Sequence, residues 1–452
     1  MSKVDPLTMT SSGAGTTRRP LMSESRVAVI GGLMVTIGPV SLTMYTPAMP
    51  QLVAAFQTDI SMVKLTITVF FLGFAVSQLI CGPLSDAYGR RPVALSFFGI
   101  YLVGAFVAML AQDMSWLLAG RALQGVGCAA GIAISRAIVR DQFTGQASAR
   151  VMNHIGTLLA IGPALSPTIG GLLLGVANWH VLFVAMSVFG VLLMGLIVLW
   201  VPETNRYPDR ALAEPRRILK SYGELLRSRV FLRASLVLAF ALGGVYTLAT
   251  LVPFILIDRV GLTPTQFGLA MMIQSCSFIV GTLVAGRLLK RVNALKLVPY
   301  GLVLAMCGAT GLSLGPQVLP LTTATIMVPI GFWTFGIAFI VPGCTTTALA
   351  GFAHIAGAAS ALMGFMQIGG GSFGSALSVL FPTPLSALAT LLPAMAFSAM
   401  ATHFLLRPPA GAPARAPEVV VEATDLELAA DPLGVIGAAG DEIEADTYAK
   451  RR

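Results

Sequence analysis

The sequence predicts an all-α polytopic membrane protein, with twelve transmembrane helices in two pseudo-symmetric halves of six. Three observations support this fold class. The 452-residue chain is 56% hydrophobic and only 11% charged, whereas soluble domains carry about 25% charged residues. Apolar runs of roughly twenty residues, the length that crosses a bilayer as a helix, recur along most of the chain. Finally, 26 of the 29 Lys and Arg residues fall on one side when these runs are threaded alternately across a membrane.

The apolar runs are the predicted spans. They lack the period of two that a membrane β-barrel requires, and several connections are so short that neighbouring spans must be antiparallel. In chain order the predicted spans are 27–49, 64–83, 93–112, 116–137, 152–175, 180–201, 234–257, 267–288, 297–315, 320–344, 358–381 and 384–406.

The placement of Lys and Arg predicts the orientation. Basic residues are retained on the cytoplasmic side, so both termini are expected in the cytoplasm and the protein in the cell inner membrane. Lys64 and Arg259 are then the only basic residues of the outside loops. The pI of 9.6 and the net charge of +9 therefore reflect topology and contact with anionic lipid head groups, and no nucleic-acid partner is expected.

Five segments follow from this layout. Two six-helix halves (27–201 and 234–406) are joined by a cytoplasmic central loop (202–233) and flanked by cytoplasmic tails (1–26 and 407–452). Within the loop, "RRILKSYGELLRSR" is expected to form a basic amphipathic helix on the inner leaflet. The C-terminal tail is rich in Ala, Pro and acidic residues and is expected to be disordered.

The stretch "GPLSDAYGRRP" (82–92) concentrates charge on the inside, between spans two and three. It resembles the G-x-L-(S/A)-D-x-x-G-R-(R/K) signature of the major facilitator superfamily, through Gly82, Leu84, Ser85, Asp86, Gly89, Arg90 and Arg91. The resemblance implies a conformational latch that stabilises the outward-facing state, in which Asp86 docks near the start of the eleventh span and pairs with Arg. Asp141, at the inner end of span four, is the expected third member. The alternative is a tight polar turn with positive-inside arginines.

The stretch "RALQGVGCAAGIAISRAIVRD" (121–141) resembles the span-four signature R-x-x-Q-G of the same family. An unpaired charge such as Arg121 inside a span costs at least about 2.5 kcal/mol. One polar, small-residue face is expected to line a cavity; its members are Arg121, Gln124, Gly125, Cys128, Gly131 and Ser135. The alternative is that Arg121 snorkels to the outer surface.

Two further stretches narrow the resemblance. "GPALSPTIGG" is similar to the antiporter signature G-P-x-x-G-G, with the Pro and the glycine pair further apart, and its small residues and prolines permit close, bent helix packing. The residues concerned are Gly162, Pro163, Ser166, Pro167, Gly170 and Gly171. "LTMYTPAMPQL" (42–52) and "AHIAGAASALMGFMQ" (353–367) resemble twelve-span drug:proton antiporters of the Bcr/CflA-like branch, which exports bicyclomycin, chloramphenicol and florfenicol.

The positions of the acidic residues do not identify what drives transport. Many relatives carry Asp where this chain has Thr43, and all 20 Asp and Glu fall in tails, loops or span ends. Export could be proton-driven through a peripheral carboxylate or a histidine, the candidates being Asp59, Asp86, Asp141, Asp258, His154, His180 and His403. The protein could instead be an uncoupled facilitator, or couple to substrate charge. The cavity could also accept neutral or anionic solutes, with Arg121 as the fixed positive charge.

Polar amides, aromatic rings and neighbouring methionines suit an adaptable, mostly neutral cavity. Each of these residues could equally form an interhelical hydrogen bond. The candidates for binding substrate or proton are Thr43, Tyr45, Gln78, Arg121, Gln124, Tyr246, Gln274, Trp333 and Gln367.

These features together predict a multidrug-type efflux transporter for small, largely hydrophobic or neutral compounds, working by alternating access and driven by proton antiport. The alternative is a dedicated exporter, or uncoupled facilitator, of one metabolite or self-made antibiotic. The spans show no paired carboxylates and no nucleophile with a base, so an enzyme is not expected. The five cysteines lack metal-site spacing, and neither metal nor cofactor is expected. The expected partners are a small-molecule substrate, protons and the lipid bilayer, and the expected state is a monomer.

Overall fold

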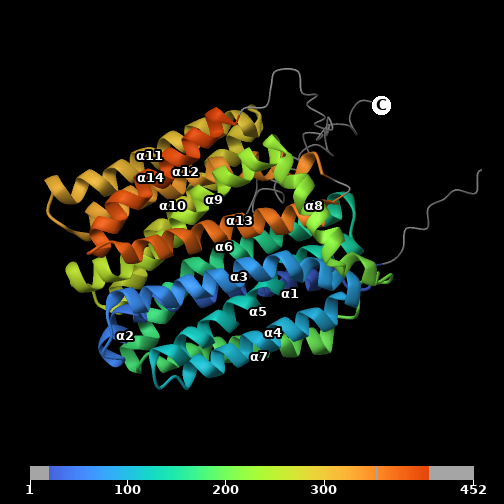
Figure 1. Cartoon of the computed structure of the whole chain (residues 1–452), viewed down its shortest axis with the longest axis horizontal. Helices are drawn as coiled ribbons and strands as arrows, with labels where there is room; N and C mark the ends of the chain where they lie inside the picture. Colours follow the sequence, from blue (N-terminus) through green and yellow to red (C-terminus); the bar gives the residue numbers. More distant parts are fainter. Residues whose placement is uncertain (1–19, 353–354, 407–452) are drawn as a thin grey trace, which may run out of the picture.

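The computed structural model describes residues 20–352 and 355–406, and this part of the chain is built from α-helices (Figure 1). The expectations for the C-terminal tail and for residues 1–19 lie outside the described residues. Each predicted span corresponds to a helix, and several helices run beyond the apolar run that predicted them. The all-α fold class is therefore confirmed.

The N-terminal half contains seven helices and one short 3-10 turn, Thr46–Ala48. In chain order the helices are α1 (Glu24–Thr43), α2 (Met49–Ala55), α3 (Ile60–Tyr88), α4 (Arg90–Met109), α5 (Met114–Gln142), α6 (Gly145–Val176) and α7 (His180–Trp200).

The C-terminal half follows the central connection, which contains α8 (Pro215–Arg227). Its helices are α9 (Arg229–Pro253), which continues as a π-helical turn (Phe254–Arg259), α10 (Pro264–Leu289), α11 (Ala294–Val318), α12 (Thr323–Ala350), α13 (Ala356–Leu377) and α14 (Pro384–Leu405).

Polar caps explain why some helices begin before their apolar run. The side chain of Asp59 accepts a hydrogen bond from the backbone N–H of Met62, so α3 begins at Ile60. Asp113 similarly accepts from the N–H groups of Ser115 and Trp116 at the start of α5. A cap satisfies backbone donors that have no partner in the first turn, and hydropathy alone does not register it.

Eleven helical segments among the described residues are long and apolar enough to cross a membrane, so the protein is a multi-pass membrane protein. The predicted eleventh span, which is α13, is not among them. It is a continuous helix, but Gly, Ser and Gln interrupt its apolar residues. Its place in the fold explains this composition, because α13 packs against other helices on several sides.

Each half has its own hydrophobic core, and the halves meet along two helix pairs. Helix α3 packs against α13, and α6 packs against α10 (Figure 1). Helix α3 runs from Lys64 near one end of the bundle to Asp86 near the other. We refer to these ends as the Lys64 end and the Asp86 end.

The expectation that Lys64 belongs to an outside loop is wrong. Lys64 lies in the second turn of α3, and only 2% of its surface is exposed. Its ammonium donates a 3.0 Å hydrogen bond to the backbone carbonyl of Ser378 in the other half. The error arises because a charge at the edge of an apolar run reads as the edge of the span, whereas the cap at Asp59 starts the helix earlier.

Helix α8 is the helix expected within "RRILKSYGELLRSR", and it is tied to the N-terminal half. The hydroxyl of Tyr222 donates a 2.6 Å hydrogen bond to the carbonyl of Leu79 in α3. Burial raises the pKa of Tyr222 to about 12, so this hydroxyl keeps its proton at neutral pH. The central connection is therefore fastened to the α3 side of the seam between the halves.

Candidate functional site

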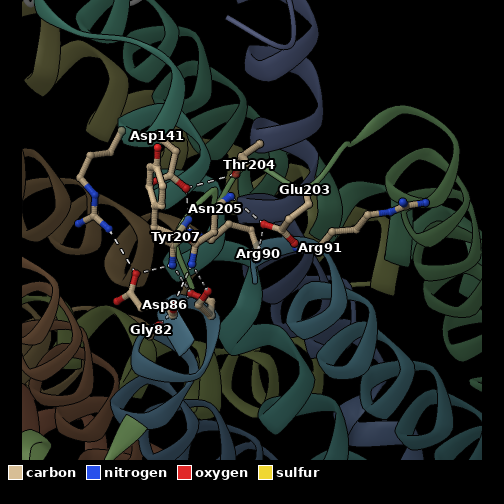
Figure 2. Close-up of polar contacts among 11 residues, drawn as sticks. Gly82, Asp86, Arg90, Arg91, Asp141, Glu203, Thr204, Asn205 and Tyr207 are labelled. Carbon is tan, nitrogen blue, oxygen red and sulfur yellow. Dashed lines mark hydrogen bonds and ion pairs between the residues drawn. The ribbon is translucent and has the colours of Figure 1, made fainter. Parts of the chain in front are cut away.

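The connection between α3 and α4 holds a compact charge cluster at the Asp86 end (Figure 2). Gly89 separates the two helices with a φ of 101°, a conformation that side chains with a Cβ rarely adopt. This turn places Arg90 back over the end of α3, where its guanidinium pairs with Asp86. Arg90 also donates to Asp141 of α5 over 2.9 Å. The structure thus brings together the three residues that the sequence suggested as a latch.

Arg90 is the centre of this cluster. Only 4% of its side chain is exposed, against 28% for Asp86 and 16% for Asp141. Two carboxylates and the hydroxyl of Ser85 accept its hydrogen bonds. Such pairing offsets the cost of burying a guanidinium. Arg140 adds a longer contact to Asp86, 3.7 Å, from the exposed side.

The segment after α7 closes over this hairpin, and sequence reasoning missed its role. The carboxylate of Glu203 accepts hydrogen bonds from the backbone N–H groups of Arg90, at 2.9 Å, and Arg91, at 3.1 Å. It therefore caps the first turn of α4. The sequence signal was a lone carboxylate in "PETN" directly after an apolar run. Which helix end it would meet depends on tertiary structure.

Two neighbours of Glu203 make further contacts with the end of α3 and with α5 (Figure 2). Thr204 donates to Asp141 over 3.2 Å. The amide of Asn205 donates to the backbone carbonyl of Asp86 over 2.8 Å. The connection that leads into the second half thus holds the carboxylate of Asp141 and the backbone of Asp86.

The start of α13 lies across a small cavity from this cluster. The cavity has a volume of about 170 Å³, and its walls come from α3, α5 and α13, with Arg90 of α4. Asp86, Ala356 and Gly357 all line it. Within the described residues, the carboxylate of Asp86 pairs with Arg90 and Arg140 rather than with α13. The N-cap of α13, Ile355, supplies no side-chain hydrogen bond to the first turn of that helix.

Arg121 is fully buried in the N-terminal half, so it does not snorkel to the surface. Its guanidinium lies 4.5 Å from the ring centre of Tyr45 and 4.2 Å from that of Phe70. It donates to the side-chain oxygen of Gln124 over 2.9 Å and more weakly to the carbonyl of Ser41 over 3.4 Å. Aromatic faces stabilise a cation in an apolar setting. In the described part of the chain, these rings take the place of a carboxylate.

The rest of the small-residue face on α5 is packed rather than open. A Cβ at Gly125 would collide with the backbone carbonyl of Phe70, and one at Gly131 with that of Met34. Cys128 and Ser135 are buried too. The stripe lets α1 and α3 approach α5 closely, because glycine removes the side chain that would hold them apart.

The expected cavity residues are spread over the bundle. Tyr45 is buried and hydrogen-bonded to Thr66, and Thr43 donates to the carbonyl of Pro39. The ring centre of Tyr246 lies 4.9 Å from that of Phe71, across the interface between the halves.

The other expected residues lie elsewhere in the bundle. Trp333 is buried against Gly244 inside the second half. Gln274 and Gln367 are half-buried on α10 and α13. Among the expected set, Gln78 lines the cavity at the Asp86 end.

Helix α6 joins the halves at the Lys64 end through the stripe that resembles the antiporter signature. A Cβ at Gly171 would collide with the carbonyl of Pro264 in α10, and one at Gly170 with the carbonyl of Met44. Across the same pair of helices, Thr168 donates to the carbonyl of Gly268 over 3.0 Å, and Thr265 donates to the carbonyl of Gly171 over 3.1 Å.

The remaining residues of this stripe lie within the N-terminal half. Gly162 packs against Thr36 of α1, and the hydroxyl of Ser166 donates to the carbonyl of Gly162. Pro163 and Pro167 lie inside α6.

Helices α3 and α13 form the second closed contact at the Lys64 end. Beside the bond from Lys64 to Ser378, the hydroxyls of Thr68 and Ser375 lie 2.8 Å apart, and Ser372 donates to the carbonyl of Thr68 over 3.2 Å. All of these atoms are buried. The halves are therefore sealed at the Lys64 end, whereas a small cavity lies between them at the Asp86 end.

Comparison with known proteins agrees with this arrangement. The family described as the Major Facilitator Superfamily matches residues 32–375. The chain is 31% identical to an "Uncharacterized MFS-type transporter YdgK" of Bacillus subtilis (strain 168), over 78% of this chain and 88% of that protein. It is 28% identical to "Multidrug resistance protein D" of Escherichia coli (strain K12), over 77% and 87%. It is 26% identical to a "Bicyclomycin resistance protein homolog" of Haemophilus influenzae, over 83% and 94%. The last two agree with the branch expected from the sequence.

Proposed function

The chain belongs to the Major Facilitator Superfamily, and on this premise we propose that it is a multidrug-type exporter of small, largely apolar compounds across the cell inner membrane. Membership indicates a membrane transporter rather than an enzyme. The two halves rock against each other, so that a site between them opens to one side of the membrane at a time.

The observation that carries the proposal is the asymmetry of the seam between the halves. Buried hydrogen bonds and glycine contacts close the Lys64 end, and a cavity opens the Asp86 end. This is the form expected of a transporter whose two halves are closed at one side of the membrane and open at the other. We assign the Asp86 end to the cytoplasm, with both termini there, because basic residues collect at that end.

The relatives support drugs as the substrate class. Two of them are named for multidrug resistance and for resistance to bicyclomycin, and each is matched over most of its length. A dedicated exporter of one metabolite or self-made antibiotic is the second candidate, since the half-buried amides and fixed aromatic rings between the helices also suit a single ligand.

The charge cluster acts as the latch of the outward-facing state. When the Asp86 end closes, Asp86 approaches the start of α13, where the N-cap residue Ile355 supplies no side-chain hydrogen bond. A carboxylate at a helix N-terminus is favoured by about 0.3–1 kcal/mol. Glu203, Thr204 and Asn205 hold the hairpin in the correct position for this contact.

Proton antiport is the proposed source of energy, and it needs a peripheral group. Asp59 caps α3, and Asp86 and Asp141 hold Arg90. Among the histidines, His403 is buried and accepts a hydrogen bond from Arg233, while His180 stacks on Trp179. Asp258 has none of these roles in the described part of the chain, so it is the carboxylate most available to a proton.

Growth in antibiotics tests the function. Expression in a pump-deficient bacterium should raise resistance to several chemically unrelated compounds, and Asp258→Asn should reduce it without lowering the amount of protein in the membrane. Resistance to none of a broad panel would favour the dedicated exporter. Transport into proteoliposomes that ignores an imposed pH gradient and its dissipation would rule out proton coupling.

A further inference from the structure

The cavity at the Asp86 end contains a basic side chain that the latch does not use. Arg136 of α5 lines this cavity and is exposed, although its neighbours Ser135 and Ala137 are buried. Part of its surface therefore contributes to the cavity wall. The guanidinium donates a 3.1 Å hydrogen bond to the hydroxyl of Ser360 on α13, across the interface between the halves.

Arg136 has no ion pair in the part of the chain that the structure describes. The acidic side chain that shares its cavity, Asp86, is already held by Arg90 and Arg140. Among the described residues, the cavity walls thus carry three arginines and one aspartate. A guanidinium carries five N–H donors in a planar fork, and Ser360 accepts from a single nitrogen of Arg136.

A second polar side chain in the same cavity also lacks an acceptor. Only 2% of Gln78 is exposed, and its amide nitrogen has no hydrogen-bond partner among the described residues. The amide oxygen lies against Gly364 of α13, where even a Cβ would come within 3.1 Å of it. A buried donor without an acceptor costs about 1–3 kcal/mol. Two helices therefore carry unused donors beside this cavity, that of Gln78 being covered in this conformation.

The remaining walls are apolar or small. Ile132, Ala133 and Ala361 line the cavity beside the polar groups, and Gly357 leaves room at the start of α13. This combination fits a molecule with an apolar body and a compact, acceptor-rich head group. A carboxylate fits best, because its two oxygens match the fork of a guanidinium and accept further N–H bonds.

We propose that Arg136, with Gln78 and Ser360, binds the anionic head group of the exported compound, and that the cargo is an amphiphilic organic anion such as an apolar carboxylate. This inference rests on the proposed export function and specifies its substrate class. The anion enters from the Asp86 end and accepts from Arg136 and Gln78, while Ser360 donates its hydroxyl. Because Arg136 lies on one half and Ser360 on the other, the bound anion contacts both moving parts.

Two fluorescent dyes that differ in one group provide the probe. Dansylglycine carries a carboxylate, and dansylglycinamide replaces it with a neutral amide on the same apolar body. Binding of each dye to the purified full-length protein is followed by fluorescence titration. We expect dansylglycine to bind about tenfold more tightly, as one charge-assisted contact implies. Equal affinity for the two dyes would overturn the proposal.

Variants assign the preference to Arg136. Arg136→Gln should bring the two affinities within about twofold of each other, and Arg136→Lys should keep part of the preference for the anion. The control is Arg287→Gln. Arg287 is an exposed residue in the last turn of α10, at the Asp86 end of the bundle, and it does not line the cavity. Its replacement should change neither affinity. An anion preference that survives Arg136→Gln would show that the site lies elsewhere.

Uptake into inside-out vesicles separates this inference from the export function. If dansylglycinamide is transported and dansylglycine is not, export stands and the anion site is wrong. If dansylglycine binds through Arg136 but neither dye is transported and the antibiotic panel shows no resistance, the site stands and export is wrong. Transport of dansylglycine that falls in Arg136→Gln but not in Arg287→Gln supports both.

Discussion

The Nε atom of Arg90 donates a 2.9 Å hydrogen bond to the carboxylate of Asp141, which lies 51 residues later in the chain. This bond joins the start of α4 to the end of α5 and fixes the position of a guanidinium that is almost entirely buried. The hairpin is therefore held by a specific pairing and not only by the tendency of arginines to remain on the inside.

Asp141→Asn should lower stability, because Arg90 would keep its charge with one carboxylate fewer. We expect a loss of about 1–3 kcal/mol, visible as a lower apparent melting temperature of the protein in detergent. Glu214→Gln removes a charge from an exposed position at the start of α8 and should have little effect. Equal melting temperatures for Asp141→Asn and wild type would mean that Asp86 alone is enough for Arg90.

Glu203→Ala should loosen the first turn of α4, since two backbone N–H groups lose their acceptor. The expected cost is about 1 kcal/mol, typical of a lost helix cap. Faster hydrogen exchange at Arg90 and Arg91, with no change at the far end of α4, would locate the effect. Uniformly faster exchange along α4 would instead indicate a general loss of packing.

Asp86→Asn should slow transport about two- to fivefold while leaving the affinity for a neutral compound nearly unchanged, because a carboxylate favours a helix N-terminus by about 0.3–1 kcal/mol. Turnover in proteoliposomes and equilibrium binding measure the two quantities separately. A large loss of affinity with normal turnover would show that Asp86 contacts the substrate and is not a latch.

Gly171→Ala should open the Lys64 end, since the new methyl group would collide with the carbonyl of Pro264. Spin labels at Ala55 and Leu380, one on each half, report this as a longer distance between them. Gly156→Ala is the matched control on the same helix, because its Cβ would meet nothing within 4 Å. An unchanged distance in Gly171→Ala would mean that α6 and α10 shift without separating the halves.

Lys64→Met should leave stability unchanged or raise it. The ammonium is buried at the cost of several kcal/mol, and the bond to Ser378 returns about 1.5–3 kcal/mol. Thermal unfolding beside Lys296→Met, an exposed position, measures the difference. A clear drop in melting temperature for Lys64→Met alone would contradict this balance.

Much of this fold could be predicted from apolar run length and the side on which basic residues lie. The positions of Asp86, Arg90 and Asp141 at one end of the bundle also follow, because α3 and α5 end, and α4 begins, on the same side of the membrane. Glu203 was missed since its partners lie 112 and 113 residues earlier, and only tertiary structure brings them together. Lys64 was misplaced because hydropathy averages over a window, whereas burial depends on the contacts of one side chain.

Three of the hydrogen bonds that seal the Lys64 end share a property that matters for how the protein tolerates mutation. The acceptors at Gly171, Gly268 and Ser378 are backbone carbonyls, which no substitution can delete. Only the donors Thr265, Thr168 and Lys64 are open to loss. A substitution on the acceptor side can thus change shape but cannot remove the acceptor, and each of these three bonds has one vulnerable partner, whereas the Thr68–Ser375 pair has two.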